Sequence, residues 1–462
     1  MNQNRTLRKL PAVDHVLRSE GLREYRELHS HSVVVTCIRE SIRDFRIAMA
    51  LHAEWNPDDV LNSIVDSVQK KLQSMTMKSL RPVINATGII LHTNLGRAPL
   101  ASKAIERMLS VAAYTNLELD IDSGKRSRRG ENVTRLLAMA TGAEDALVVN
   151  NCAAATILVL QSLAMGREVI ISRGQLVEIG GGFRLPEVFK SAGVILREVG
   201  TTNRTYFRDY HEAICPATGA VILVHPSNFS QTGFVSAPSV MELVSSLKDR
   251  TFPVIHDIGS GNLYDLSQFR LNEPSVKESI QSGVDLCLFS GDKLFGGPQC
   301  GVIVGKRFWM DQLRSNSLMR ALRVDKSTLG ALEATAEIHM SGKAFEQLPT
   351  LQMLATPLDE VHSRCLELHG QLTSSIQWRL SVCKCESFVG GGTLPSQGIP
   401  SFSLQIEGAY LDQLAKSLRL GIKAILPRLS ENKILLDMRT VDSRDIGYVA
   451  SRLQELLAEP EG

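Results

Sequence analysis

Lys293 is the residue of this chain best suited to covalent chemistry. It follows the apolar run Val284–Phe289, which is typical of a strand buried on both faces of a parallel sheet. It lies in the glycine-rich turn Ser290–Gly301. A lysine that leaves a buried strand is partly desolvated, and this favours the neutral amine that forms a Schiff base. The alternative is a surface lysine in a tight turn, which this segment taken alone slightly favours.

Asp257 makes the Schiff-base interpretation of Lys293 the stronger one. Like Lys293, it follows an apolar run and is followed by glycines. It ends the apolar run Phe252–Asp257, and glycines follow at positions 259 and 261. Enzymes that use pyridoxal phosphate need such a pair. The lysine binds the cofactor aldehyde, and the carboxylate keeps the pyridine nitrogen protonated, so that the ring withdraws electrons. The alternative for Asp257 is the N-cap of a helix that follows a strand.

A third segment could bind the cofactor phosphate. Ala146–Asn150 is predicted to be a strand, and a helix that starts with small residues follows it through about Leu163. Small side chains at Cys152, Ala153 and Ala154 would let backbone N–H groups approach a phosphate at the positive end of the helix dipole. Ser290 could add a hydroxyl. The alternative is a small-residue helix that packs tightly on the sheet.

The elements that must position these residues form an α/β pattern. Helical segments separate most of the predicted strands, which favours a mostly parallel sheet with helices on both faces. Ligands bind such sheets at the carboxyl ends of the strands. Asn150, Asp257 and Ser290 all lie at such ends. The predicted strands are 146–150, 168–172, 194–198, 220–225, 253–257, 284–289 and 301–305.

Two further domains are predicted to flank this one, giving the division 1–80, 81–325 and 326–462. The first 80 residues are charged and contain few glycines. From residue 326, helices are predicted to about 380, followed by short strands at 401–406 and 433–437 and helices at 407–418 and 441–458, as in a small α+β domain. The N-terminal segment carries apolar residues at helical spacing: Val34, Val35, Ile38, Ile42, Phe45 and Met49.

Composition excludes several classes of protein. The 51 Lys and Arg residues nearly balance the 49 Asp and Glu residues, so net charge indicates no nucleic-acid partner. No apolar run approaches the roughly 20 residues that cross a bilayer, and the N-terminus lacks the apolar core of a signal peptide. Eight scattered cysteines predict reduced thiols and a cytoplasmic protein. Cys383-Lys384-Cys385 has no second ligand pair, so we expect a strand there and no metal site.

Long motifs along the chain resemble those of the bacterial selenocysteine synthases, the L-seryl-tRNA(Sec) selenium transferases. The Lys293 turn is one of them, and such long runs are far more specific than a short pattern. The resemblance implies a fold-type-I pyridoxal-phosphate enzyme with a mostly parallel seven-stranded sheet, a small C-terminal domain and an N-terminal helical domain that binds tRNA. The other motifs are Leu10–Asp14, Arg81–Gly88, Leu91–Ala98, Val177–Gly181 and Gly200–Thr205.

The resemblance also implies roles for the residues described above. Lys293 would bind pyridoxal 5'-phosphate and then act as acid and base at the substrate Cα, and Asp257 would pair with the pyridine nitrogen. Cys152, Ala153, Ala154 and Ser290 would bind the cofactor phosphate. Four arginines would bind selenophosphate, since guanidinium groups match phosphate geometry. They are Arg97, Arg129, Arg320 and Arg323, each of which would otherwise be assigned to a surface ion pair. Because Arg320 and Arg323 are three residues apart on a predicted helix, we expect them to share one face.

The implied reaction converts L-seryl-tRNA(Sec) to L-selenocysteinyl-tRNA(Sec). The serine hydroxyl leaves as water, which gives an aminoacrylyl intermediate, and selenium from selenophosphate adds at Cβ. Hydroxide is a poor leaving group, so a general acid is needed, and Lys293 and His225 are both candidates. Four residues depart from the usual family pattern: Ser127, Cys152, Pro226 and Phe229.

Two other functions stay open. Related proteins use the same core as lyases acting on a small amino acid or an amino sugar acid, but they often lack the N-terminal domain that residues 1–80 provide here. A tRNA-binding scaffold on a decayed enzyme core is the other possibility, and intact Lys293 and Asp257 argue against it. The resemblance further implies a homo-oligomer, a pentamer of dimers, with Gly200–Thr202 at the contact between dimers.

Overall fold

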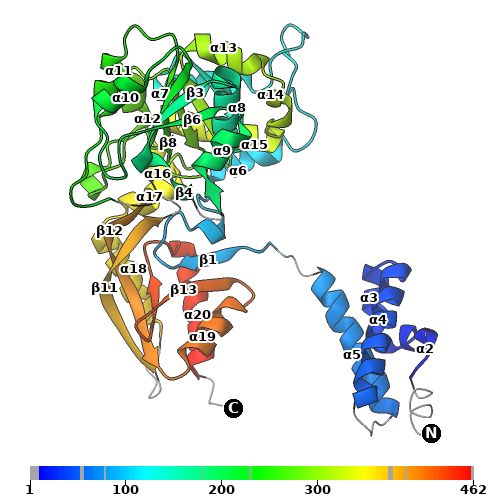
Figure 1. Cartoon of the computed structure of the whole chain (residues 1–462). Helices are drawn as coiled ribbons and strands as arrows, with labels where there is room; N and C mark the ends of the chain where they lie inside the picture. Colours follow the sequence, from blue (N-terminus) through cyan, green and yellow to red (C-terminus); the bar gives the residue numbers. More distant parts are fainter. Residues whose placement is uncertain are drawn as a thin grey trace. The chain divides into compact units, whose positions relative to one another are not determined.

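The computed structural model describes residues 10–51, 57–76, 80–179, 182–227, 229, 231–372, 378–390 and 393–458. The chain forms two compact units, Met1–Pro82 and Val83–Gly462 (Figure 1). Each unit has its own buried apolar core.

The first unit is helical, as the sequence predicts. Its two long helices are α4 (His31–Leu51) and α5 (Pro57–Thr76), and the shorter α2 (Val13–Leu17), η2 (Glu20–Leu22) and α3 (Arg23–Leu28) precede them. Val34, Ile38 and Ile42 of α4 pack against Ile64 and other apolar residues of α5. The helical spacing of these apolar residues therefore corresponds to the face on which the two helices meet.

A seven-stranded sheet forms the centre of the second unit and confirms the prediction of a mostly parallel sheet. The strand order is β2-β10-β9-β8-β7-β3-β6. Only β10 runs antiparallel to its two neighbours. The strands are β2 (Asp145–Val149), β3 (Glu168–Ser172), β6 (Ile195–Val199), β7 (Thr218–Val224), β8 (Val254–Gly259), β9 (Leu286–Ser290) and β10 (Gly301–Gly305).

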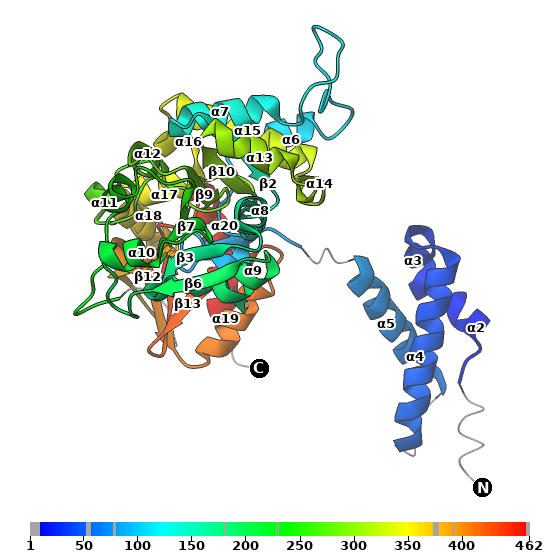
Figure 2. The same cartoon turned by 45° about the horizontal axis from the view of Figure 1, so that its top comes forward.

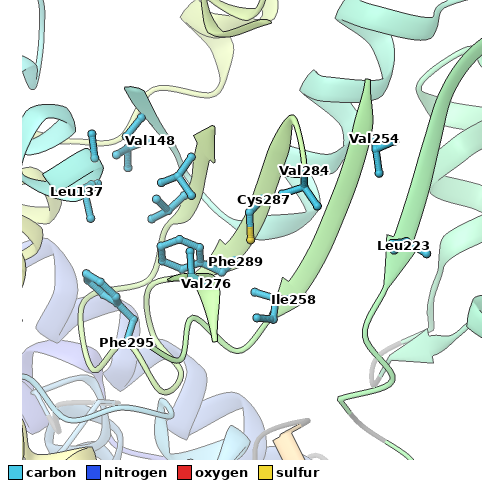
Figure 3. Packing of buried hydrophobic residues seen from close by; sticks show 14 of the residues in the cluster. Leu137, Val148, Leu223, Val254, Ile258, Val276, Val284, Cys287, Phe289 and Phe295 are labelled. Atoms are coloured by element: carbon cyan, nitrogen blue, oxygen red, sulfur yellow. The ribbon is translucent and has the colours of Figure 1, made fainter. Parts of the chain in front are cut away.

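Helices cover both faces of this sheet because successive strand residues point to opposite sides. In β2, Ala146 and Val148 belong to one core cluster, and Leu147 and Val149 belong to the other. Figure 3 shows the first cluster, in which Phe289 and Phe295 lie close together. The helices of the first cluster are α7 (Glu131–Thr141), α10 (Phe207–Ala213), α11 (Val240–Ser246), α12 (Val276–Gln281) and α15 (Lys326–Met340). Those of the second are α8 (Cys152–Ala164), α9 (Leu185–Ser191) and α13 (Arg307–Ser315).

A five-stranded sheet with the order β1-β13-β14-β12-β11 forms the C-terminal part. Here β11 (Trp378–Gly390) and β12 (Thr393–Gly408) make a long hairpin where the sequence predicts only short strands, at Cys383–Cys385 and at 401–406. The other strands are β1 (Val83–Ala86), β13 (Ala424–Ser430) and β14 (Lys433–Asp437). The helices on this sheet are α18 (Leu358–Gly370), α19 (Leu411–Arg419) and α20 (Ile446–Ala458).

Two contacts cross the domain boundaries that the sequence predicts at residues 81 and 326. Strand β1 pairs with β13, so it belongs to the C-terminal sheet and not to the large one. Helix α15 packs on α6 (Ser102–Ser110) and α7, beside the large sheet. The remaining short elements are α14 (Leu318–Ala321), α16 (Ala344–Gln347), α17 (Pro349–Ala355), β4 (Glu178–Ile179) and β5 (Phe183–Arg184).

Candidate active site

A cavity of about 260 Å³ lies at the carboxyl ends of β7, β8 and β9 and beside the start of α8. Lys293 and Asp257 both line it, together with Arg97. Three segments far apart in the sequence therefore meet where a parallel sheet usually binds its ligand. The other predicted site residues that line this cavity are Cys152, Ala153 and Ser290.

Lys293 is held in the turn that follows β9. The turn is closed by hydrogen bonds from Gly291 N to Cys300 O (2.9 Å) and from Gly297 N to Gly291 O (2.8 Å). Lys293 is buried, and its Nζ lies 3.6 Å from the position that a Cβ on Gly259 would occupy. The amine therefore lies above the end of β8, two residues beyond Asp257.

Asp257 is partly exposed to the cavity that it lines, and its carboxylate lies beside two neutral side-chain donors. The Cys152 thiol lies 3.7 Å from one carboxylate oxygen, and the Thr156 hydroxyl lies 3.3 Å from the other. Burial raises the pKa of Asp257, and the charge of Lys293 and these two donors offset part of that effect. Burial and the nearby Asp257 also raise the pKa of Cys152, so this residue stays a thiol. The Gly259 amide also lowers the pKa of Asp257, but the effect of burial remains the larger one. A carboxylate in this setting fits a protonated pyridine nitrogen.

In the first turn of α8, only some of the backbone amides predicted to bind phosphate are available. Asn151 caps the helix, and its Oδ1 accepts a hydrogen bond from Ala154 N at 2.8 Å. The Ala154 amide is therefore already used, and Ala154 does not line the cavity. The amides of Cys152 and Ala153 have no acceptor among the described residues. These two amides and the Ser290 hydroxyl fit a phosphate at a helix start.

Arg97 is held near Lys293 because it forms an ion pair with Asp292, the residue before Lys293. Its Nη1 lies 2.7 Å from Asp292 Oδ2, and the Ala98 amide donates to Asp292 O. The Arg97 backbone is left-handed, with φ of 61°. A non-glycine residue in this conformation is strained, and such strain is common where a side chain must be held in a functional position.

The other three predicted arginines lie elsewhere. Arg129, Arg320 and Arg323 line a second hollow of about 1320 Å³ that shares no lining residue with the first cavity. Arg129 is fixed there by its bond to Val324 O at 2.7 Å. The expectation that Arg320 and Arg323 share a helix face is wrong, because α14 ends at Ala321 and Arg323 lies beyond it.

Several further residues line the first cavity that the sequence did not single out. Gly259 is the last residue of β8 and Ser227 lies shortly after β7, so the strand-end rule could have found both. Thr156 comes from the second turn of α8 and Gln299 from the Lys293 turn, and neither carries a sequence signal of its own. Two glycines of the predicted motif Val177–Gly181, at positions 180 and 181, lie outside the described residues.

The fold is that of the fold-type-I pyridoxal-phosphate enzymes. The solved structure of a D-glucosaminate-6-phosphate ammonia-lyase matches with a TM-score of 0.59 at 19% sequence identity. The match covers 83% of this chain and 97% of that chain. The predicted fold class is therefore confirmed.

The family follows from closer relatives. One family model, L-seryl-tRNA selenium transferase, matches residues 83–442, and a second, selenocysteine synthase N terminal, matches residues 7–46. An L-seryl-tRNA(Sec) selenium transferase from Carboxydothermus hydrogenoformans is 40% identical over 462 residues, which is 99% of each chain. Another, from Clostridium botulinum strain Okra, is 40% identical over 465 residues, 99% of this chain and 100% of the relative. The chain belongs to the L-seryl-tRNA selenium transferase family, as its motifs predict.

Three observations on the described residues complete the picture. No helix among them is long and apolar enough to cross a membrane. No group of three or more His, Cys, Asp and Glu side chains among them could hold a metal ion. None of the eight cysteines, all of which lie in the described part of the chain, forms a disulfide in the structure.

Proposed function

We propose that this protein converts L-seryl-tRNA(Sec) to L-selenocysteinyl-tRNA(Sec), with pyridoxal 5'-phosphate as cofactor and selenophosphate as selenium donor. One observation carries the proposal. Lys293 and Asp257, from neighbouring strands, line one cavity in a chain that is 40% identical over nearly its full length to transferases of that name. Both are residue types that the cofactor requires.

The cofactor would be held at three points. Lys293 would bind it covalently through its amine, and Asp257 would pair with the ring nitrogen. The amides of Cys152 and Ala153, with the Ser290 hydroxyl, would bind its phosphate. When bound, pyridoxal phosphate withdraws electrons from the substrate Cα, which makes loss of a proton and of the β-hydroxyl feasible.

The chain's own residues would move the protons. The Lys293 amine, released when the seryl amine takes its place, would accept the proton from the seryl Cα. The electron pair left there forms the Cα–Cβ double bond as the Cβ–O bond breaks. The hydroxyl would take a proton from Lys293 or His225 and leave as water. The selenium of selenophosphate would then add at Cβ and a proton return to Cα. Water would cleave the P–Se bond and release phosphate, while the aminoacyl ester to tRNA stays intact.

The four arginines would act together only across two copies of the chain. Arg97 lines the first cavity, whereas Arg129, Arg320 and Arg323 line the separate hollow. The segment between α6 and α7, which carries Arg129, extends away from the rest of the unit (Figures 1 and 2). It also exposes apolar side chains, with Ile121 67% exposed. These features support a dimer in which three arginines of one copy face the Lys293 cavity of the other.

The larger assembly and the tRNA contact rest on the family. We propose a pentamer of dimers in the cytoplasm, with Thr201 and Thr202 at the contact between dimers, where both are exposed. The N-terminal unit, which has its own core, would bind the tRNA body through phosphate and shape contacts. Such binding should weaken steeply with salt, and a salt-insensitive affinity would contradict it.

The first experiment mixes the purified protein with seryl-tRNA(Sec), without selenophosphate, and follows the visible absorbance of the cofactor. A shift to a longer-lived species, absent in Lys293→Ala, would support seryl-tRNA as substrate. If only a free amino acid or amino sugar acid produced a shift, the protein would be a small-molecule lyase. If no visible band formed after cofactor addition, the enzyme proposal would fail.

A complementation experiment tests the shared site. Lys293→Ala and the double variant Arg320→Ala/Arg323→Ala should each be inactive alone. Dimers that contain one copy of each should regain up to about half of the wild-type activity per dimer, because one of the two sites is then intact. Mixed dimers without activity would show that each copy uses its own arginines. Two lysine variants that differ only in an affinity tag provide the control for mixing.

A further inference from the structure

His225 and Glu273 form a buried pair beside the cavity. His225 follows β7, and its Nε2 lies 3.2 Å from Glu273 Oε2. The Glu273 side chain is fully buried, whereas His225 is 20% exposed and lines the cavity. Glu273 does not line it. Nε2 therefore faces away from the cavity, toward the carboxylate, and Nδ1 is the ring nitrogen left for a ligand.

Glu273 is unusual in having so few partners. Its Oε1 is buried without a hydrogen-bond partner among the described residues, and the His225 ring is paired with Oε2. A buried carboxylate is costly unless it is paired. The segment that carries it is nevertheless fixed, since buried Asn262 donates to Glu273 O at 3.1 Å and accepts from Val276 N at 2.8 Å.

The order of the strands assigns His225 to one edge of the bound cofactor. In the order β9-β8-β7, Asp257 lies between the Lys293 and His225 strands, and the His225 amide donates to Asp257 O at 2.9 Å. The proposed phosphate ligands, at the start of α8 and at Ser290, lie on the β2 and β9 side. In pyridoxal phosphate, the phosphate arm and the ring hydroxyl are on opposite sides of the axis through the ring nitrogen. The hydroxyl would therefore face β7.

We propose that Glu273 is a positioning residue that holds the proton of His225 on Nε2, so that Nδ1 is presented to the ring hydroxyl of the cofactor. This inference rests on the proposed function, because it requires pyridoxal phosphate in the cavity. Glu273 would act only through His225. With its proton on Nε2, His225 has none to give the substrate, which leaves Lys293 as the acid for the departing hydroxyl. A proton is shared between the ring hydroxyl and the nitrogen that would join Lys293 to the cofactor. Its position would then depend on both His225 and Glu273.

The test is the visible spectrum of the resting holoenzyme, which needs no turnover. The position of that proton sets the ratio of the two absorbance bands of the bound cofactor. We expect His225→Gln and Glu273→Gln each to change this ratio at least twofold, and the double variant to change it no further. His225→Asn, whose amide oxygen can accept a hydrogen bond in place of Nδ1, should stay closer to wild type than His225→Gln does.

Glu278→Gln is the matched control, since Glu278 lies five residues further on and caps α12 through Ser275. It should leave the band ratio unchanged. A normal ratio in Glu273→Gln, or an additive change in the double variant, would overturn the pairing. If Glu273→Gln did not fold, Glu273→Asp should show the same shift, because the shorter side chain no longer reaches Nε2. A wild-type protein with no visible band would instead refute the proposed function itself.

Discussion

Gly259→Ala tests whether the space above Asp257 is where the cofactor binds. Gly259 has a φ of 66°, a left-handed conformation that glycine adopts freely. A Cβ there would lie 3.6 Å from both Lys293 Nζ and Ser227 Oγ. The added methyl group would therefore contact both polar atoms without a clash. It would fill space between them that a bound ring needs.

Gly259→Ala should affect the stability of the fold and the affinity for the cofactor by different amounts. The left-handed backbone should lower the free energy of unfolding by about 1 kcal/mol. An overlap of one methyl group with a bound ligand costs about 1–3 kcal/mol. Since 1.4 kcal/mol is a factor of ten, the affinity for pyridoxal phosphate should fall about 5- to 150-fold. The loss of affinity should thus be large while the loss of stability stays modest.

The assay titrates cofactor-free protein with pyridoxal phosphate and follows visible absorbance, while urea unfolding measures stability. Gly166→Ala is the matched control, because Gly166 has a φ of 72° and nothing lies within 4 Å of its added Cβ. It should lose the same stability and keep its affinity for the cofactor. Wild-type affinity in Gly259→Ala would refute the assignment of the cofactor to this part of the cavity.

Three further predictions follow from the structure and the proposed assembly. Because burial raises the pKa of Asp257, its charged form destabilises the fold above the ordinary carboxyl pKa. Cofactor-free Asp257→Asn should therefore be at least as stable as wild type to urea at pH 8, yet bind the cofactor at least tenfold more weakly. Burial lowers the pKa of His256 to about 3, with a contribution from His225, and that of His339 to about 4. Both must stay neutral in the fold, so unfolding free energy should fall from pH 6.5 downward, by on the order of 3 kcal/mol for each histidine at pH 4; a flat profile would contradict this. Bulky side chains at Thr201 and Thr202 should reduce the assembly to dimers, and an unchanged mass in solution would exclude this contact.

The large sheet could be predicted from sequence because each strand is a short apolar run buried on both faces. β3 and β10 begin and end at the predicted residues. The full length of the β11–β12 hairpin could not be predicted. Most residues of β11 are partly buried or exposed, so this strand contains no continuous apolar run. The pairing of β1 with β13 joins segments about 340 residues apart, and a local pattern cannot reveal it.

At the candidate site too, local sequence patterns predict some features and cannot reveal others. Lys293, Asp257 and Ser290 could be placed together because each lies at or just beyond the end of a recognisable strand, and strand ends of a parallel sheet meet. The capped amide of Ala154 could not be foreseen, since it depends on the rotamer of Asn151. Arg129, Arg320 and Arg323 follow no strand of the sheet, and their separation from Arg97 is a property of the folded chain.

The charges of the cavity indicate why a cofactor with a cationic ring suits it. Arg97 and Asp292 form an ion pair, so they largely neutralise each other. This leaves Lys293 as the cation that offsets the charge of Asp257. When the Lys293 amine binds an aldehyde and exchanges protons with substrate, that offset is weakened, and Asp257 needs another positive group. A protonated pyridine nitrogen supplies it, while Cys152 and Thr156 can only donate neutral hydrogen bonds. The Cys152 side chain therefore bears on the environment of Asp257, and a phosphate held by backbone amides would be little affected by it.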